Sequence, residues 1–206
     1  MPDFLPPRLY PILDSSCFLN ESELFSAARA LAGVGCTLLQ YRNKTGSSRE
    51  MLSHARELRR IVGRQVMLIM NDRADLALAA DFDGVHVGQD DLSVQAVRRI
   101  LGPKMIVGTS THNPEQVQEA VAADPDYIAF GPVFATGSKA NPDPVVGLEG
   151  VRLARSLTNK PLVAIGGITA AHARSVIDAG ANSLALISAL LPDPAKSTAQ
   201  FESVLM

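Results

Sequence analysis

Short apolar runs alternate with amphipathic stretches along the whole chain. Each run has roughly the four to eight residues of a buried strand. The eight runs span residues 9–14, 37–43, 66–71, 84–89, 105–111, 127–134, 161–167 and 183–190. Strands that alternate with helices in this way are typical of a closed (β/α)8 barrel, the TIM barrel. We therefore predict an α/β fold with a single (β/α)8-barrel catalytic domain over residues 1–206.

The stretches between the runs carry helical signals. Residues 47–62 place most of their apolar side chains on one stripe, with arginine and glutamate elsewhere. Residues 113–123 open with a capping asparagine and then proline, which suits the first helical position, and residues 169–180 end on glycine, a common helix stop. An open doubly wound sheet is the rival fold, but residues 9–20 lack the glycine-rich turn that follows its first strand.

Composition and charge narrow the class of protein. Of the 206 residues, 47% are hydrophobic and the net charge is −2, with both signs mixed along the chain. This balance argues against a nucleic-acid partner, which requires a basic face. No run reaches the ~20 apolar residues of a membrane span, and the N-terminus does not resemble a signal peptide, so we predict a cytoplasmic protein without a membrane partner. Cys17 and Cys36 lack CxxC spacing and are predicted to be buried thiols.

Cationic and polar side chains end the second run. Gln40, Arg42 and Lys44 lie two residues apart, so in a strand they face the same side. If that side faces the mouth of the barrel, where catalytic groups gather, the two cations form an anion site. The arginine fork suits phosphate oxygens. The alternative for both cations is a solvated loop start.

Acids follow the third and the fourth runs. Asn71 and Asp72 come at the end of one, and Asp90 and Asp91 come after the other. Adjacent strands lie about 4.8 Å apart, so carboxylates at these ends can share a hard cation such as Mg²⁺, which also takes substrate phosphates as ligands. Helix capping is the alternative: Asp90 or Asp91 for a helix over 93–101, and Asp72 for the segment that follows it.

The last strand ends carry small and hydroxyl-bearing residues. They include Thr136, Ser138 and Lys139 after the sixth run, Gly166 and Gly167 after the seventh, and Ser188 in the eighth. Glycines at the seventh and eighth strand ends let backbone N–H groups approach a phosphate, and this is where barrels of this kind commonly bind one. A tight turn is the alternative explanation for the glycines.

The remaining titratable residues suggest ordinary roles. His54 and His172 are predicted to face solvent, His86 to be a hydrogen-bonded interior histidine, and Asp83 to be a surface or turn acid. No pair of histidines has zinc-ligand spacing, and no GxSxG motif is present. We therefore expect catalysis by positioning and charge stabilisation rather than by a protein nucleophile.

Six motifs, in this order along the chain, carry a resemblance to a known family. They are QYRNK at 40–44, NDRADLALAADFDGVHVGQDD at 71–91, GTSTH at 108–112, DYIAFGPVFATGSK at 126–139, VAIGGI at 163–168 and ALIS at 185–188. Together they resemble thiamine phosphate synthase. The resemblance implies a (β/α)8 barrel, Mg²⁺ as cofactor, and small-molecule substrates. These are 4-amino-5-hydroxymethyl-2-methylpyrimidine diphosphate and 4-methyl-5-(2-hydroxyethyl)thiazole phosphate or its carboxylated form.

The resemblance also implies site residues. The pyrimidine diphosphate site takes Gln40, Tyr41, Arg42, Asn43, Lys44, Asn71, Ser110 and Lys139, of which Arg42, Lys44, Ser110 and Lys139 are catalytic. The thiazole phosphate site takes Thr136, Gly137, Ser138, Gly167, Ile187 and Ser188. The metal site takes Asp72 and Asp91, which leaves Asp90 as a bystander or a cap.

The implied reaction is dissociative. Pyrophosphate leaves first, and the thiazole nitrogen then attacks a pyrimidine-stabilised methylene cation. The attacking nitrogen carries no proton, which agrees with the missing nucleophile–base pair. Three alternatives stay open: a thiazole tautomerase, which tends to carry histidine where this chain has Pro132; a Schiff-base lyase using Lys44 or Lys139; and a non-catalytic phosphate-ligand binder. A homo-oligomer is possible, and the preferred thiazole form is left open.

Overall fold

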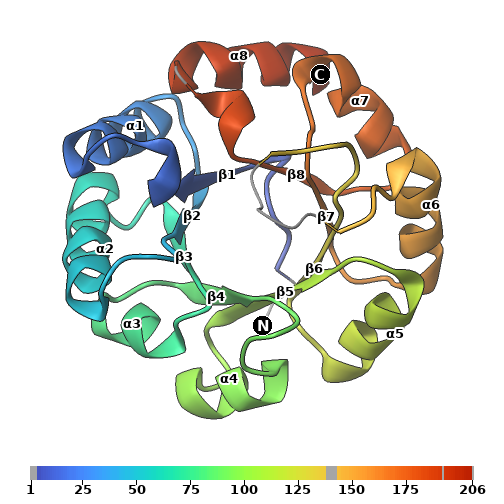
Figure 1. The fold of residues 1–206 in the computed structure, drawn as a ribbon, viewed down its shortest axis with the longest axis horizontal. Helices are drawn as coiled ribbons and strands as arrows, with labels where there is room; N and C mark the ends of the chain where they lie inside the picture. The colour runs from blue at the N-terminus through green and yellow to red at the C-terminus, as the bar shows by residue number, and fades with distance from the viewer. Residues whose placement is uncertain (1–3, 138–142, 192, 206) are drawn as a thin grey trace.

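Eight parallel strands close into a barrel whose neighbours follow the order of the chain (Figure 1). The structure is a computed structural model, and it describes residues 4–137, 143–191 and 193–205. The strands are β1 (Leu9–Asp14), β2 (Leu38–Arg42), β3 (Met67–Asn71), β4 (Gly84–Val87), β5 (Ile106–Thr111), β6 (Tyr127–Phe130), β7 (Leu162–Ile165) and β8 (Ser183–Leu186). Each lies within one of the predicted apolar runs, so the predicted (β/α)8 barrel is confirmed.

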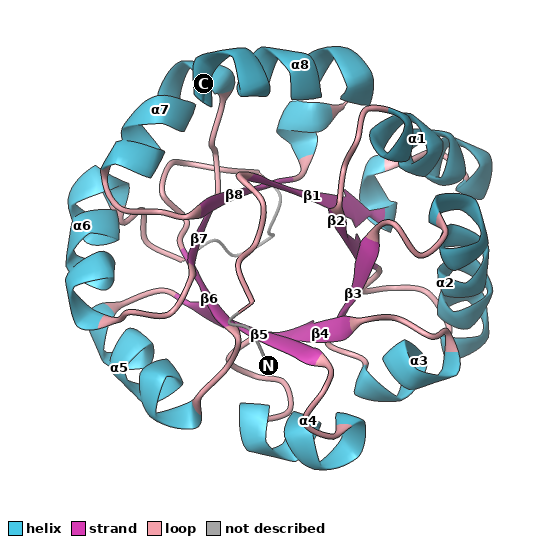
Figure 2. Ribbon diagram, turned by 180° about the vertical axis from the view of Figure 1, so that it is seen from behind, coloured by secondary structure: helices cyan, strands magenta, loops and turns pink. Residues whose placement is uncertain are grey.

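Helices surround the barrel on its outside (Figure 2). They are α1 (Glu21–Gly33), α2 (Ser48–Val62), α3 (Ala74–Ala79), α4 (Val94–Leu101), α5 (Pro114–Ala123), α6 (Gly147–Leu157), α7 (Ala170–Asp178) and α8 (Pro194–Leu205), with short 3-10 helices η1 (Ser15–Cys17) and η2 (Ser188–Leu190). Within the described ranges, none of these helices combines the length and the apolar character needed to cross a membrane.

Alternation along the strands separates two hydrophobic layers. Leu39 and Tyr41 pack in the large cluster between the strands and the helices, whereas Leu38 packs in the smaller cluster inside the barrel. Successive side chains of a strand point to opposite faces, so the intervening Gln40 belongs to the interior side. Gln40 and Arg42 have the same parity, so packing of the alternate residues against the helices turns both toward the interior side, as predicted.

Side-chain caps define where several helices begin. Ser47, Ser93 and Asn113 each accept a hydrogen bond from the backbone N–H three residues further on, at 3.2, 3.2 and 2.9 Å. Such caps satisfy backbone donors that have no partner within the helix. Because Ser93 caps α4, neither Asp90 nor Asp91 is needed as its cap.

The N-terminal ends of the strands carry a repeated clamp. Arg59 of α2, Arg98 of α4 and Arg155 of α6 each bond the side chain that precedes β4, β6 or β8: Asp83, Asp126 and Asn182. Each of those side chains also accepts a backbone N–H from the preceding strand, at 2.7, 2.6 and 2.8 Å. The prediction that Asp83 is an ordinary surface acid is therefore wrong. It belongs to a structural repeat that spans two strands.

Both cysteines differ from the prediction. Cys17 is exposed in η1, and Cys36 is half-buried before β2. Burial raises the pKa of the Cys36 thiol to about 11, although its Sγ donates to the Leu38 carbonyl. The Cys17 pKa is also raised, first by partial burial and then by the charge of Asp14. Both groups therefore stay thiols near neutral pH.

Candidate active site

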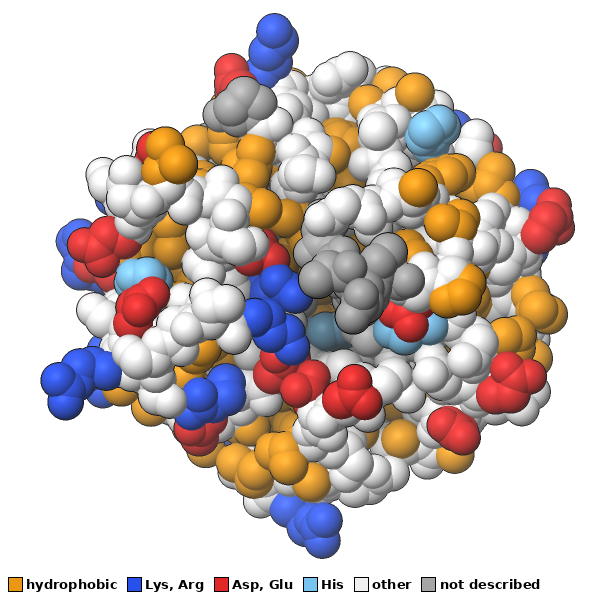
Figure 3. All heavy atoms as spheres, in the orientation of Figure 1, with side chains coloured by type: hydrophobic (Ala, Val, Ile, Leu, Met, Phe, Trp, Pro, Cys, Tyr) orange, Lys and Arg blue, Asp and Glu red, His pale blue; other side chains and the backbone are white. Residues whose placement is uncertain are grey.

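The carboxyl ends of the strands enclose a cavity of about 820 Å³. Residues from all eight strands line it, and the loops after β3 and β4 add an acidic rim. Basic and acidic side chains lie side by side near the centre of the face drawn in Figure 3. Active sites of this fold occur at this end of the barrel, so the cavity is the candidate active site.

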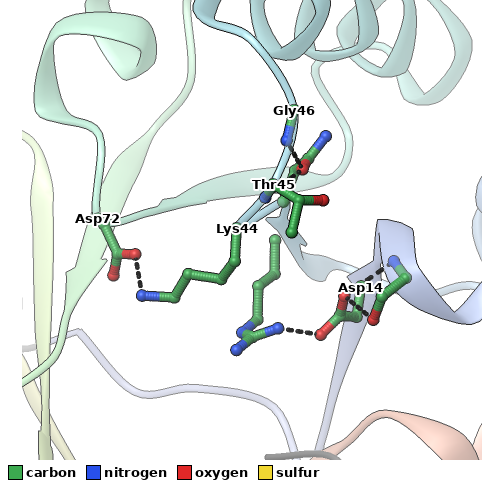
Figure 4. Close-up of polar contacts among 8 residues, drawn as sticks. Asp14, Lys44, Thr45, Gly46 and Asp72 are labelled. Atoms are coloured by element: carbon green, nitrogen blue, oxygen red, sulfur yellow. Dashed lines mark hydrogen bonds and ion pairs between the residues drawn. The ribbon is translucent and has the colours of Figure 1, made fainter.

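Arg42 at the end of β2 and Lys44 in the loop that follows both line the cavity, and each forms an ion pair there. Arg42 pairs with Asp14, and Lys44 extends toward Asp72 of the β3 end (Figure 4). The side chain of Asp14 is only 2% exposed. Its second oxygen accepts from the Ser16 N–H at 3.0 Å and the Ser16 hydroxyl at 2.7 Å. Asp14 was absent from the predicted site, because nothing in its local sequence marks Arg42 as its partner.

Tyr41 and Asn43 do not line this cavity, in contrast to the prediction that they contact the pyrimidine diphosphate. They have the opposite parity to Arg42. The Tyr41 hydroxyl lies 3.0 Å from Nδ1 of His54, in the helix layer. His54 is buried, so its predicted exposure is wrong.

Asn43 organises the loop that carries Lys44. Its Oδ1 accepts from the backbone N–H groups of Thr45 at 3.1 Å and Gly46 at 2.8 Å (Figure 4). Its amide nitrogen donates to the Tyr41 hydroxyl at 3.2 Å. The geometry thus gives Asn43 a positioning role behind the cavity wall.

Asp72 and Asp91 meet at the rim. Asp72 has φ of +60°, and its backbone N–H donates to the carbonyl of His86 on β4 at 2.7 Å. The Asp91 carboxylate accepts from the Gly88 N–H at 2.8 Å. Both acids line the cavity, and the exposed Asp90 lies beside Asp91 on the same rim.

The two carboxyl groups titrate as a pair. Burial raises the pKa of Asp72, and the nearby Asp91 adds to this, against the opposing charge of Lys44. Burial also acts to raise the pKa of Asp91, but hydrogen bonds from the Asp72 carboxyl and the Gly88 N–H lower it overall. Each carboxyl group therefore shifts the pKa of the other, that of Asp72 upward and that of Asp91 downward. Within the described residues no third His, Cys, Asp or Glu joins them as a metal-ligating group.

Gln40, Asn71 and Ser110 are the other predicted pyrimidine-site residues that the structure describes, and all three line the cavity. Among the described residues, the Asn71 amide nitrogen is buried without a hydrogen-bond partner. Leaving such a donor unpaired costs about 1–3 kcal/mol, so the site suits a ligand that offers an acceptor. The Ser110 hydroxyl lies 2.8 Å from Nε2 of His86. His86 itself is buried and hydrogen-bonded, as expected of an interior histidine.

The predicted thiazole phosphate residues that the structure describes lie across the barrel from β3. Thr136, Gly137, Gly167, Ile187 and Ser188 all line the cavity. Ser138 and Lys139 lie outside the described residues. Gly167 has φ of +63°, and a Cβ there would lie 2.4 Å from the Ala135 carbonyl oxygen, so only glycine fits.

The fold and the cavity define the class of protein first: a (β/α)8-barrel enzyme whose site combines paired cations with paired acids. The sequence profile of the thiamine monophosphate synthase family matches residues 9–190, and the chain belongs to this family. The thiamine-phosphate synthase of Koribacter versatilis (strain Ellin345) is 60% identical over 97% of this chain and 96% of its own. That of Chloroflexus aurantiacus is 44% identical over 89% of this chain and 85% of its own.

Among solved structures, the thiamine phosphate pyrophosphorylase of Pyrococcus furiosus superposes with a TM-score of 0.84 at 32% identity. It covers 96% of this chain and 95% of its own. The predicted family is therefore confirmed, and the activity is thiamine-phosphate synthesis, a transferase reaction of thiamine biosynthesis. The tautomerase and the non-catalytic binder are not favoured, and the cavity carries Pro132 where the tautomerase tends to carry histidine.

Proposed function

We propose that the chain joins the pyrimidine diphosphate to the thiazole phosphate, or to its carboxylated form, releasing pyrophosphate and thiamine monophosphate. The observation that carries this proposal is the pairing of Arg42 and Lys44 with acids on one side of the cavity. The β6–β8 ends, with Gly167 and Ser188, lie on the other side. Two phosphorylated substrates can thus enter from opposite sides, with the reacting atoms between them.

Mg²⁺ is the proposed cofactor, held by Asp72 and Asp91. The donor set supports this: the carboxyl groups of Asp72 and Asp91 come from adjacent strand ends and lie close enough to shift each other's pKa. Protein sites for Mg²⁺ often supply one or two carboxylates and leave the other positions to water and substrate phosphate. When bound, the ion supplies positive charge that stabilises the diphosphate leaving group.

The chain's own residues bind and stabilise the departing group. Arg42 and Lys44, together with Lys139 in the proposed site, offer N–H donors to the diphosphate oxygens as negative charge develops there. Charge-assisted bonds of this kind are roughly twice as strong as neutral ones. The Asn71 amide, which has no hydrogen-bond partner among the described residues, supplies one more donor, and Ser110 another.

The proposed chemistry proceeds by cleavage before attack. The bond between the pyrimidine methylene carbon and the bridging oxygen breaks, and both electrons leave with pyrophosphate. The resulting methylene cation is stabilised by the aminopyrimidine ring. The thiazole nitrogen donates its lone pair to that carbon, which forms the new carbon–nitrogen bond without any proton transfer.

Turnover tests the proposal. Purified protein should form thiamine phosphate and pyrophosphate only when both substrates and Mg²⁺ are present, and EDTA should abolish the reaction reversibly. Product formation at full rate in EDTA would overturn the metal assignment. Thiazole isomerisation without pyrophosphate release would overturn the synthase reaction.

A cytoplasmic location and the lack of nucleic-acid or membrane partners remain part of the proposal, supported by the balanced net charge of −2. A homo-oligomer is also proposed. Light scattering on the purified chain would measure its assembly state, and a mass of one chain at micromolar concentration would overturn the oligomer.

A further inference from the structure

A chain of polar side chains crosses the otherwise apolar interior of the barrel. The Gln40 amide nitrogen donates to the Tyr10 hydroxyl at 2.9 Å, and that hydroxyl lies 2.9 Å from the hydroxyl of Tyr127. The Tyr127 hydroxyl lies 3.0 Å from Nδ1 of His86, whose Nε2 lies 2.8 Å from the Ser110 hydroxyl. Both ends of the chain, Gln40 and Ser110, line the cavity. None of its three middle members was predicted as a site residue.

Burial keeps both tyrosines protonated. Tyr10 and Tyr127 are 1% and 0% exposed, and desolvation raises the pKa of each phenol far above its usual range. Their rings also pack edge to face, with centroids 5.8 Å apart. Each phenol therefore carries one hydrogen, and a buried hydrogen of this kind needs an acceptor.

One direction along the chain gives every hydrogen an acceptor. The Gln40 amide donates to the Tyr10 oxygen, and in this direction the Tyr10 hydrogen points to the Tyr127 oxygen 2.9 Å away. The Tyr127 hydrogen then points to Nδ1 of His86. When His86 is neutral, an imidazole that accepts at Nδ1 carries its hydrogen on Nε2, and in that tautomer His86 donates to the oxygen of Ser110.

We propose that Tyr10, Tyr127 and His86 are positioning residues that hold Ser110 as a hydrogen-bond donor toward the ligand. The serine oxygen accepts from His86, so its own hydrogen points to an acceptor in the cavity. The same direction turns the Gln40 amide nitrogen toward Tyr10 and leaves its carbonyl oxygen to accept from the ligand. The ligand that fits presents an acceptor to Ser110 and an N–H donor to Gln40, as an aminopyrimidine diphosphate does.

This direction also excludes a second role for the pair. A serine 2.8 Å from a histidine nitrogen has the geometry of a nucleophile and its general base. Nε2 of His86 already carries a hydrogen, however, and cannot take the proton of Ser110. The chain therefore uses the histidine to orient the hydroxyl and not to activate it.

The tautomer of His86 can be measured directly in the ligand-free protein. Long-range ¹H–¹⁵N correlation spectra distinguish an imidazole with its hydrogen on Nε2 from one with its hydrogen on Nδ1, and His86→Gln identifies the signal. We expect the Nε2–H pattern in the wild-type chain and its loss in Tyr127→Phe. Tyr41→Phe is the matched control, because that hydroxyl bonds His54 outside the barrel at 3.0 Å and should leave the His86 signal unchanged. An Nδ1–H pattern in the wild-type chain would overturn the proposal.

The effect of the chain on substrate binding rests on the proposed function, and it is measured by KM, separately from the His86 tautomer. In Tyr10→Phe and Tyr127→Phe we expect KM for the pyrimidine diphosphate to rise about tenfold, with a smaller change in KM for the thiazole phosphate. Thr198→Val removes another buried hydroxyl, on α8, and should change neither constant. Unchanged KM values in both folded phenylalanine variants would refute the coupling to Ser110. A wild-type chain without any turnover would refute the proposed function, while the tautomer measurement would still stand.

Discussion

The Asp14 carboxylate at the end of β1 accepts a hydrogen bond from the Arg42 guanidinium at the end of β2. The acid is 2% exposed, and the arginine side chain is 19% exposed. Asp14 therefore holds one nitrogen of the guanidinium from the adjacent strand, while Arg42 also lines the cavity. A bidentate donor of this kind depends on its orientation as well as its charge.

Replacing Asp14 by Asn should release Arg42 while keeping the shape of the side chain. We expect kcat/KM for the pyrimidine diphosphate to fall about 10- to 100-fold, since a misplaced charge-assisted bond costs roughly 1.5–3 kcal/mol. Asp178→Asn is the control, because that acid pairs with Arg174 on the exposed face of α7. This substitution should cost under ~0.5 kcal/mol of stability and leave kcat/KM unchanged. Steady-state kinetics decide the matter, and wild-type values for Asp14→Asn would show that Arg42 needs no support.

Asp72→Asn should lower turnover while leaving the fold as stable or more stable. Burial raises the pKa of Asp72, so its charged form is disfavoured in the folded protein. The free-energy cost of burying the Asp72 charge is absent when pH lies below the pKa of the unfolded chain. It is fully present once pH exceeds the raised pKa of the folded protein. An uncharged amide avoids that cost at neutral pH, and asparagine also tolerates a positive φ.

Thermal melts and Mg²⁺-dependent turnover measure these two effects. We expect a loss of at least ~100-fold in kcat/KM for Asp72→Asn and for Asp91→Asn. Asp90→Asn changes the adjacent exposed acid and should retain activity. A Tm several degrees below wild type for Asp72→Asn at neutral pH would contradict the assignment of the carboxylate as a net cost to folding.

Asn43 should act through its side-chain oxygen, because that atom holds the Thr45 and Gly46 N–H groups. Asn43→Ala removes both bonds and should raise KM for the pyrimidine diphosphate several-fold, with a loss of about 1–2 kcal/mol in stability. Asn43→Asp keeps an oxygen at the same position and should recover most of the affinity. If the alanine and aspartate variants bind equally poorly, the amide nitrogen matters instead.

Gly167→Ala should disturb the thiazole side of the cavity. The new methyl group would lie 2.4 Å from the Ala135 carbonyl oxygen, in a backbone conformation with φ of +63°. We expect a loss of about 1–3 kcal/mol in stability and a rise in KM for the thiazole phosphate that exceeds the rise for the other substrate. Gly33→Ala in α1 meets no atom within 4 Å and should be neutral or stabilising by up to ~1 kcal/mol. Denaturant unfolding and kinetics measure both variants.

Arg98→Met should weaken the fold and leave catalysis intact. Arg98 bonds Asp126 at the N-terminal end of the barrel, away from the cavity, and Asp126 also accepts the Val107 N–H at 2.6 Å. We expect a loss of about 2 kcal/mol, or roughly 4–8 °C in Tm for a chain of this size. A fall in kcat/KM larger than twofold below the melting range would contradict a purely structural role.

The family motifs located much of the cavity wall in advance, because the residues concerned lie at strand ends. Arg42 and Lys44 line the cavity as their parity predicted, and Asp72 and Asp91 meet at the rim as the order of the strands predicted. Tyr41 lies outside the cavity wall because a motif is contiguous, whereas the faces of a strand alternate. Only every second residue of QYRNK can face the cavity.

Periodicity predicted the eight strands and the helices between them, since spacing along the chain sets which face of an element is apolar. The missing glycine-rich turn after the first strand then favoured a closed barrel over an open sheet. The tertiary structure alone decided the partners of the polar groups. Asp14 lies 28 residues from Arg42, and Tyr127 lies 41 residues from His86. No local pattern encodes such a distance. Burial makes each pairing necessary, because a buried polar group without a hydrogen-bond partner destabilises the fold.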